Sequence, residues 1–323
     1  MIRSFELVLA HICALSTGFS NAHLVQLPKI SGLPAPHPLA ISADGKTVVG
    51  QFAPGQPFTW RGGEVARFRP SSNPKVLAQY AQAVSADGQV IVGQAGGAYV
   101  WTRHKGLQMI GNASSFARAV NEKGTAVACQ VQGNPDVRGY LWTKSGVINF
   151  DSFTPTCISG DGKVVAGIRA DHTTVRAYEF RNQVSQELPL PDIYTDSSAY
   201  GVNKDGSVIV GGAISDENSP AAFWKNGKFV KLDLLGQANA VAKTVARDGS
   251  FIGGYAGPEA VVWKADGTGN YLEMILKTSG ASTKGWRFES IDGLARVGNT
   301  VYVTGWAHVN DHEAGYWASF RVK

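Results

Sequence analysis

The chain has 323 residues and a formal net charge of +5, and 44% of its residues are hydrophobic while 17% are charged. This composition, with 38 glycines, is typical of a globular protein rich in turns. Because no block of like charges occurs, the composition argues against a dedicated nucleic-acid-binding arm, and we expect no nucleic-acid partner.

The first 22 residues are predicted to form a secretory signal peptide. Arg3 provides the positive start, a mostly apolar run covers 5–15, and small residues favour cleavage between Ala22 and His23. The alternative is a buried N-terminal strand or short helix. No later stretch reaches the roughly 18 apolar residues of a membrane-spanning helix. We therefore expect a soluble secreted protein, with 23–323 as a single domain.

A ten-residue phrase recurs along the rest of the chain. It reads ISADGKTVVG from Ile41, and further copies start at Val84, Val120, Ile158, Val202 and Val245, with a degenerate seventh copy at 293–305. The first six copies start 36 to 44 residues apart, and the 301 residues after position 22 amount to 43 for each of the seven copies. A regular spacing of this size is typical of a solenoid or a propeller.

Each unit contains four short β-type runs separated by turn signals. In the second unit these runs are 81–86, 90–93, 98–101 and 107–110. The Asp-Gly pair between the first two runs predicts a two-residue type I′ hairpin, in which both central residues have positive φ. Four antiparallel strands in about 40 residues make a propeller blade. We therefore predict an all-β protein, a seven-bladed β-propeller of four-stranded antiparallel blades.

The third run of every unit carries a large aromatic residue, which we expect to pack between neighbouring blades. The seven residues are Trp60, Trp101, Trp142, Phe180, Trp224, Trp263 and Trp317. The seventh unit stops after its third run, so we predict that the mature N-terminal strand, from His23 to Leu27, completes the blade and covers its open edge. One or two helical turns are expected at 271–277.

The phrase S-x-D-G-x-x-V-V-G, followed by A-x-x-W and a turn with glycine, resembles the HAF-repeat family of bacterial extracellular proteins. The resemblance extends to 271–277, Gly285-Trp286 and Glu313 to Trp317. These resemble the segment that closes the repeat region in members that continue into an autotransporter. The resemblance implies a free-standing passenger, periplasmic or released, and it supplies no reaction and no catalytic residue.

Five copies carry the Asp-Gly pair, and we interpret these aspartates as structural turn residues. They are Asp44, Asp87, Asp161, Asp205 and Asp248. A Ser or Asn two residues earlier is expected to hydrogen-bond the turn backbone. A ring of calcium sites is the alternative, but no D-x-D-x-D-G loop supports it. We expect no metal site and no cofactor.

A cation follows the third-run aromatic by one or two residues in six units. The six are Arg61, Arg103, Lys144, Arg181, Lys225 and Lys264. Because the hairpins between strands one and two and between strands three and four open on the same face, the aspartates and these cations should share that face. The cations are either solvated turn residues or a cationic rim for anionic glycans or a membrane surface.

The opposite face should carry the variable loops, where propellers bind their ligands. His37, Tyr80 and Phe116 each lie four residues before a copy of the phrase and are the candidate ligand-binding residues. They could stack on a sugar or a peptide near the mouth of a central channel, or they could simply pack under the loops.

The remaining candidates are two cysteines and one polar cluster. Cys129 and Cys157 are left after the predicted cleavage, and they could form a disulfide between neighbouring units or remain buried free thiols. His308, Asp311, His312 and Glu313 fall in a predicted loop of the seventh blade, which we interpret as solvated rather than metal-binding.

These patterns favour a non-catalytic binding or scaffold protein at the cell envelope, with a glycan or an envelope protein as partner. No catalytic residue can be assigned. The alternative is a hydrolase or lyase that acts on glycans at the channel mouth, which would need two carboxylates converging on one face. A third reading is a subunit of an envelope assembly, for which a large exposed apolar patch would be evidence.

Overall fold

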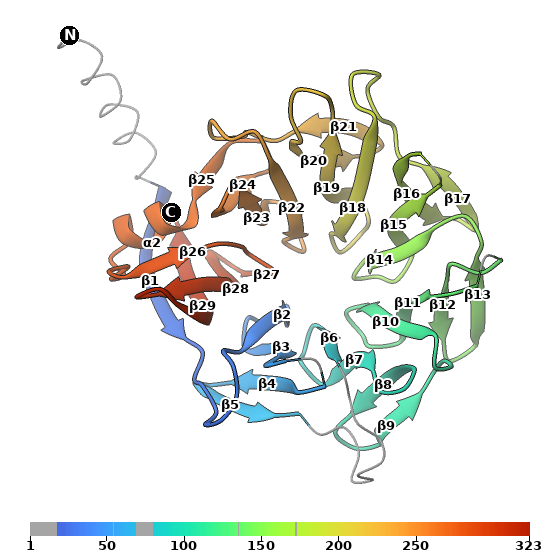
Figure 1. The fold of residues 1–323 in the computed structure, drawn as a ribbon, viewed down its shortest axis with the longest axis horizontal. Helices are drawn as coiled ribbons and strands as arrows, with labels where there is room; N and C mark the ends of the chain where they lie inside the picture. Colours follow the sequence, from blue (N-terminus) through green and yellow to red (C-terminus); the bar gives the residue numbers. More distant parts are fainter. Residues whose placement is uncertain (1–17, 54, 69–79, 135, 172) are drawn as a thin grey trace.

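The computed structural model describes residues 18–53, 55–68, 80–134, 136–171 and 173–323. Seven antiparallel sheets stand around a central axis, and each sheet forms one blade of a closed ring (Figure 1). The predicted seven-bladed propeller is therefore confirmed. Among the described residues, no helix is long and apolar enough to cross a membrane.

In each of blades 1 to 3, the four strands lie from the axis outwards in the order in which they occur in the chain. Blade 1 contains β2 (His37–Ile41), β3 (Thr47–Gln51), β4 (Pro57–Arg61) and β5 (Glu64–Arg67). Blade 2 contains β6 (Tyr80–Val84), β7 (Val90–Gln94), β8 (Ala98–Thr102) and β9 (Gly106–Met109). Blade 3 contains β10 (Ser115–Val120), β11 (Ala126–Val131), β12 (Gly139–Thr143) and β13 (Gly146–Phe150).

Blades 4 to 6 repeat this order. Blade 4 contains β14 (Thr154–Ile158), β15 (Val164–Ala170), β16 (Val175–Arg181) and β17 (Val184–Glu187). Blade 5 contains β18 (Asp196–Val202), β19 (Val208–Ile214), β20 (Ala221–Lys225) and β21 (Lys228–Lys231). Blade 6 contains β22 (Ala240–Val245), β23 (Phe251–Ala256), β24 (Glu259–Lys264) and β25 (Gly269–Tyr271), and the expected helical turns follow as α2 (Leu272–Thr278).

Blade 7 is assembled from both ends of the chain. Its first strand is broken into β26 (Trp286–Phe288) and β27 (Gly293–Val297), which both pair with β28 (Thr300–Val309). The hairpin partner of β28 is β29 (His312–Val322), and β1 (Phe19–Gln26) lies antiparallel on its outer edge. Figure 1 shows β1 beside the C-terminal strands. Closure of the ring by the N-terminal strand is thus confirmed.

Strand β1 starts earlier than the predicted mature terminus. Phe19 pairs with Val322 and is 5% exposed, and its ring packs edge-on against Phe320 with centroids 5.2 Å apart. The pairing then shifts between Ser20 and His23, and Asn21 has a positive φ of 49°. The strand therefore runs across the predicted cleavage point. The predicted signal peptide itself lies largely outside the described residues.

The Asp-Gly turns differ from the predicted two-residue type I′ hairpin. In blade 1 the Gly45 N–H donates to the Ser42 carbonyl, and only Gly45, with φ of 73°, is in the left-handed region. Ser42 Oγ accepts from the Thr47 N–H and donates to Asp44 Oδ1, at 2.9 and 2.5 Å. The side chains of Ser and Asp thus close a longer loop, so the predicted turn type is wrong for this hairpin.

Type I′ geometry occurs instead at hairpins between strands three and four. Two consecutive residues have positive φ at Gly62-Gly63, at Asn182-Gln183 and at Asn226-Gly227. Both Asn and Gly adopt this conformation at little cost, and its twist matches that of the flanking strands. The Asp-Gly pairs therefore predicted turns correctly, but the type I′ conformation occurs at the hairpins between strands three and four and not at the Asp-Gly turns.

The glycine that ends the phrase allows a close backbone approach. A Cβ added at Gly50, Gly93, Gly167, Gly211, Gly254 or Gly305 would lie 1.8 to 2.1 Å from a carbonyl oxygen of the preceding strand. In blades 1 to 6 the first strand bulges near this point, since its pairing with the second strand skips one residue. The glycine is required because no side chain fits beside the bulge.

Replacing Gly211 with alanine is therefore expected to destabilise the fold, because the new methyl would overlap the Ser198 carbonyl oxygen. Displacing that backbone should cost about 1–3 kcal/mol. The neighbouring Gly212 gives a matched control, since its added Cβ would meet nothing closer than 3.4 Å. Urea denaturation of the Gly211→Ala and Gly212→Ala variants checks this, and equal midpoints for the two would contradict it.

The third-strand aromatics pack between blades in most units. Trp60, Phe180, Trp224 and Trp263 are at most 7% exposed, whereas Trp101, Trp142 and Trp317 are half-buried. Trp317 departs from the pattern in register. Gly50 pairs with Phe58 and Gly305 with Tyr316, so the equivalent of Trp60 in blade 7 is Ala318 and not Trp317. Trp317 therefore points to the other side of its sheet.

Candidate functional site

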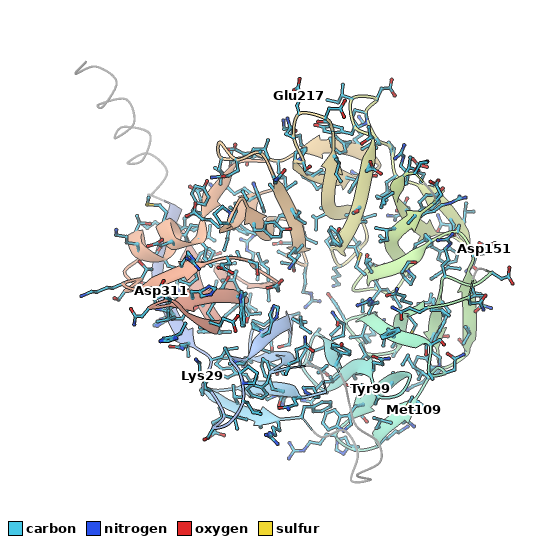
Figure 2. The ribbon with its side chains drawn as sticks, viewed as in Figure 1. Lys29, Tyr99, Met109, Asp151, Glu217 and Asp311 are labelled. Carbon is cyan, nitrogen blue, oxygen red and sulfur yellow. The ribbon has the colours of Figure 1, made fainter. Side chains whose placement is uncertain are left out.

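The two faces of the ring carry different kinds of connection. The turn face holds the hairpins between strands one and two and between strands three and four. The loop face holds the loops between strands two and three and the connections between blades. Outer positions such as Asp151, Glu217 and Met109 lie on the circumference, away from the axis (Figure 2). The axis and its two mouths are thus where all blades meet.

The axis is narrow on the turn-face side. A cavity of about 140 Å³ there is lined by residues from all seven blades, including the last residue of each first strand in blades 1 to 6. Those residues are Ile41, Val84, Val120, Ile158, Val202 and Val245. Backbone hydrogen bonds link neighbouring turns around it, for example from the Glu122 N–H to the Gly160 carbonyl. This cavity is too small for a drug-sized ligand, which takes roughly 300 Å³ or more.

An ion pair spans the axis at the same level. Arg247 in blade 6 donates to Glu122 in blade 3 at 2.5 Å, although the two residues are 125 positions apart in the chain. Both occupy the position just before the Asp-Gly dipeptide or its equivalent. The pair joins blades that are not neighbours and closes the turn-face end of the channel.

Two of the predicted rim cations tie neighbouring blades together. Arg61 in blade 1 donates to the Gly88 carbonyl in blade 2, and Arg181 in blade 4 donates to the Gly206 carbonyl in blade 5 at 2.5 Å. Lys264 is half-buried, and its Nζ lies 5.9 Å from the centroid of the Phe19 ring. Arg103, Lys144 and Lys225 are exposed. The cations do share the turn face with the aspartates, but the arginines also serve the packing of the ring.

The repeated aspartates hydrogen-bond within their own turns. Burial opposes the shift, but hydrogen bonds from Ser85 and the backbone, together with the nearby charge of Arg61, lower the pKa of Asp87, and the Ser207 donors lower that of Asp205. Asp161 accepts from Ser159 Oγ at 2.7 Å. Asp248 also accepts from Arg296 of blade 7 at 2.9 Å. Carboxylates engaged in this way fit the structural role that the sequence predicted.

On the loop face, the structure places His37, Tyr80 and Phe116 at equivalent positions of blades 1, 2 and 3. Each lies at or next to the start of a first strand, and each pairs with a glutamine of the second strand: Gln51, Gln94 and Gln130. All three are half-buried. They are thus spread around the channel mouth rather than gathered in one pocket.

The bulges add a second set of side chains to this mouth, which the sequence did not single out. The residues skipped in the pairing are Leu39, Gln82, Arg118, Thr156, Tyr200 and Lys243, in blades 1 to 6. A bulge re-aims its side chain, so each of these leaves the regular alternation of the strand. Arg118, for example, donates to Gln130 Oε1 at 2.7 Å and lies over the Phe116 ring. We call these six residues the bulge ring.

A polar cluster forms where the bulge ring meets blade 7. Lys243 Nζ donates to Asp292 Oδ1, and Ser290 Oγ donates to Asp292 Oδ2 at 2.7 Å. The Asp292 side chain is only 8% exposed, whereas that of Lys243 is 38% exposed. His37 packs against Trp306 nearby, with ring centroids 4.7 Å apart. The cluster thus combines a buried carboxylate, an accessible ammonium and an imidazole that lies on an indole.

The charges of this cluster act on His37. Burial lowers the pKa of His37 below its ordinary value of 6.5, and Lys243 lowers it further, while Asp292 and Glu313 oppose the shift. The neutral imidazole is therefore favoured in the fold, and it keeps one donor and one acceptor for a ligand. A comparison of equivalent positions among the repeated units could have identified Lys243 and Asp292, because these residues differ from those of the other units.

The lowered pKa predicts a pH dependence of stability. Below pH 6.5 the unfolded chain binds a proton at His37 more readily than the folded chain, so the free energy of unfolding falls as the pH drops through the folded-state pKa. Above pH 6.5 this contribution is fully present. The variant His37→Gln should show a shallower loss of stability between about pH 7.5 and pH 5. Urea denaturation at both values measures this, and identical slopes for wild type and variant would contradict it.

The two cysteines and the other residues of the predicted polar cluster remain. Cys129 in β11 and Cys157 in β14 are both buried free thiols, and burial raises the pKa of each to about 12. The structure therefore has the free thiols and not the disulfide. His308 Nδ1 lies 2.9 Å from Glu289 Oε1, while Asn310 and Asp311 form the tight turn between β28 and β29.

Comparison with known proteins supports the fold alone. No family model matches the chain, and no curated protein matches it. A computationally designed protein, Ika8, superposes with a TM-score of 0.52 at 15% identity, covering 90% of this chain and 99% of its own. A gluconolactonase from Xanthomonas campestris superposes with a TM-score of 0.49 at 12% identity, and the match covers 96% of this chain and 92% of the gluconolactonase. TolB from Acinetobacter baumannii superposes with a TM-score of 0.44 at 11% identity, and the match covers 84% of this chain and 78% of TolB. The likeness to the designed protein concerns the architecture alone, and identities this low carry nothing about ligand or reaction.

Proposed function

We propose that the chain is a non-catalytic binding or scaffold protein of the bacterial cell envelope, and that its ligand docks at the loop-face mouth of the channel. The observation that carries this proposal is the bulge ring. Six equivalent positions hold six different residues, whereas the turns below them repeat one phrase. A surface that varies on a repeated scaffold is where recognition concentrates.

The envelope location is part of the proposal. It rests on the signal-peptide pattern before His23 and on the resemblance of the repeated phrase to the HAF-repeat family. The assembly-subunit reading has less support. Among the described residues, the large apolar side chains that are exposed, such as Met109, Val147 and Ile214, are scattered over different blades rather than gathered in one patch.

One observation favours a glycan-acting hydrolase or lyase as the second candidate. Asp292 and Glu313 both lie near enough to His37 to oppose the lowering of its pKa, so two carboxylates and an imidazole share the mouth. Against this, both oxygens of Asp292 are already engaged by Lys243 and Ser290. A glycosidase needs one carboxyl free to give a proton and another free to attack or to activate water.

The test is a binding screen of the chain from residue 18 onward against soluble peptidoglycan fragments, lipopolysaccharide and a glycan array. We expect a saturable ligand whose affinity falls at least about tenfold in the Phe116→Ala and Arg118→Ala variants. The turn-face variant Lys225→Ala is the matched control for Arg118→Ala and should bind as wild type. Chemical conversion of the ligand that is lost in the Asp292→Asn variant would instead establish the enzyme.

A further inference from the structure

A second cavity opens on the turn face, far from the loop-face mouth. Its volume is about 610 Å³, and it lies at the seam where blade 7 meets blade 1. Its apolar wall is formed by Trp60, Tyr302 and Trp317. We call it the seam cavity. Ligand sites typically measure roughly 300–1,000 Å³ and combine apolar walls with a few polar groups.

The seam cavity exists because blade 7 departs from the repeat. The one-residue shift in register turns Trp317 towards blade 1, where its ring lies 5.5 Å from that of Trp60 and 5.7 Å from that of Tyr302, centroid to centroid. Trp317 Nε1 donates to the Gly45 carbonyl at 2.9 Å, which fixes the indole in place. The Tyr302 ring covers Gly45, where any side chain would collide with it. Two half-buried rings, those of Tyr302 and Trp317, are thus held beside the buried ring of Trp60.

The outer hairpin of blade 1 leaves this space open. It turns through Gly62 and Gly63, both with positive φ, and both line the cavity. The corresponding hairpins of blades 4 and 5 turn through Asn182-Gln183 and Asn226-Gly227, so they carry side chains there. In blade 1 the missing side chains leave room for a ligand.

The polar rim of the cavity is balanced in charge. It contains two carboxylates, Asp44 and Asp87, two cations, Lys46 and Arg61, and the amide of Gln89. Such a rim favours neither an anion nor a cation, and it offers both donors and acceptors at several points. A ligand with many hydroxyl groups and an apolar ring face would use both the rim and the aromatic wall.

A buried donor in the wall lacks an acceptor. Trp60 is 5% exposed, and its Nε1 has no hydrogen-bond partner among the described residues. In blades 5 and 6 the equivalent indoles of Trp224 and Trp263 donate to the Pro189 and Asp233 carbonyls at 2.7 and 2.8 Å. A buried polar group without a partner is costly. The unpartnered donor shows that the contact of Trp60 with blade 7 differs from the corresponding contacts in blades 5 and 6.

We propose that the seam cavity binds one neutral sugar ring, stacked on the Trp317 indole and hydrogen-bonded to the rim around Gln89 and Lys46. This site is separate from the proposed ligand site on the loop face. The sugar could be a free monosaccharide or one unit of a longer glycan, and the chemistry of recognition is the same for both.

Isothermal titration calorimetry on the chain from residue 18 onward tests this with five probes. These are the methyl β-glycosides of glucose, galactose and N-acetylglucosamine, together with cellobiose and chitobiose. We expect saturable binding of at least one probe. Tighter binding of a disaccharide than of its monosaccharide would identify a glycan chain as the source, and equal binding would identify the single ring.

Two variants locate the site, and two others serve as controls. Gln89→Ala removes one rim hydrogen bond without touching the aromatic wall and should weaken binding roughly three- to tenfold. Trp317→Ala should weaken it more than about tenfold. Lys163→Ala changes the same turn position in blade 4 and should bind as wild type. The loop-face variant Phe116→Ala should also bind as wild type, which separates this proposal from the proposed function. No saturable binding of any probe, or wild-type binding by both Gln89→Ala and Trp317→Ala, would overturn the proposal.

Discussion

A chain that begins at Pro28, and so lacks β1 and Leu27, is expected to lose its stable closed ring. Leu27 is fully buried, and β1 covers the outer edge of β29 along six residue pairs. Without β1, the backbone donors and acceptors of that edge lose their partners, and Phe320 loses its contact with Phe19. We expect a broad, early unfolding transition and concentration-dependent association through the exposed strand.

A chain that begins at His23 should have a stability between those of the chains that begin at Gly18 and at Pro28. It keeps the strand pairs from His23 to Gln26 but loses Phe19. Loss of the buried Phe19 ring should cost about 2 kcal/mol. Thermal unfolding of chains starting at Gly18, His23 and Pro28, compared at two concentrations, checks the order of stability. Unfolding of the chain from Pro28 at the same temperature as the chain from Gly18 would show that β1 is not needed to close the ring.

The second large effect is expected at Trp263. This residue is completely buried between blades 5 and 6, and its Nε1 donates to the Asp233 carbonyl at 2.8 Å. Replacement by alanine should cost about 3–5 kcal/mol, because it opens a cavity and leaves the carbonyl without its donor. Trp263→Phe, which keeps the ring but not the N–H, should cost about 1–3 kcal/mol.

The half-buried Trp142 of blade 3 provides the matched comparison. Trp142→Ala should cost clearly less than Trp263→Ala, because fewer atoms leave the core. Urea denaturation gives the free energy of unfolding for all three variants. Equal costs for Trp142→Ala and Trp263→Ala would show that burial between blades does not determine the contribution of the aromatic residue.

The blade count and the closure of the ring could be predicted because they depend on spacing and on apolar runs. The phrase repeats every 36 to 44 residues, and the apolar strand from His23 to Leu27 has no partner within its own unit. The burial of Trp224 and Trp263 followed from the same regularity, since a large aromatic residue at one position per blade must pack against the next blade.

Features that depend on one-residue shifts could not be predicted. The bulges that re-aim Arg118 and Lys243 arise from how two strands pair, and no local sequence signal marks them. The displaced register of Trp317 has the same origin, because a slip of one residue moves a side chain to the other face of its sheet. The seam cavity depends on that slip and on contacts between residues more than 250 positions apart.

The contacts of Arg61 and Arg181 with the next blade also could not be predicted from the sequence. Arg61 and Arg181 look like solvated hairpin residues when read along the chain. In space each reaches the Asp-Gly turn of the next blade. Propeller blades touch only their neighbours around most of the ring, so such contacts between units are visible only once the units are placed side by side.

Backbone hydrogen exchange, measured by mass spectrometry with and without soluble peptidoglycan fragments or lipopolysaccharide, tests whether the repeated phrase is scaffold and whether binding occurs where the seven copies differ. We predict slower exchange in the first strands at 37–41, 80–84 and 115–120, no change in the repeated turns at 159–163 and 203–207, and recovery of the ligand intact. Equal protection of those repeated turns, or conversion of the ligand, would contradict this prediction.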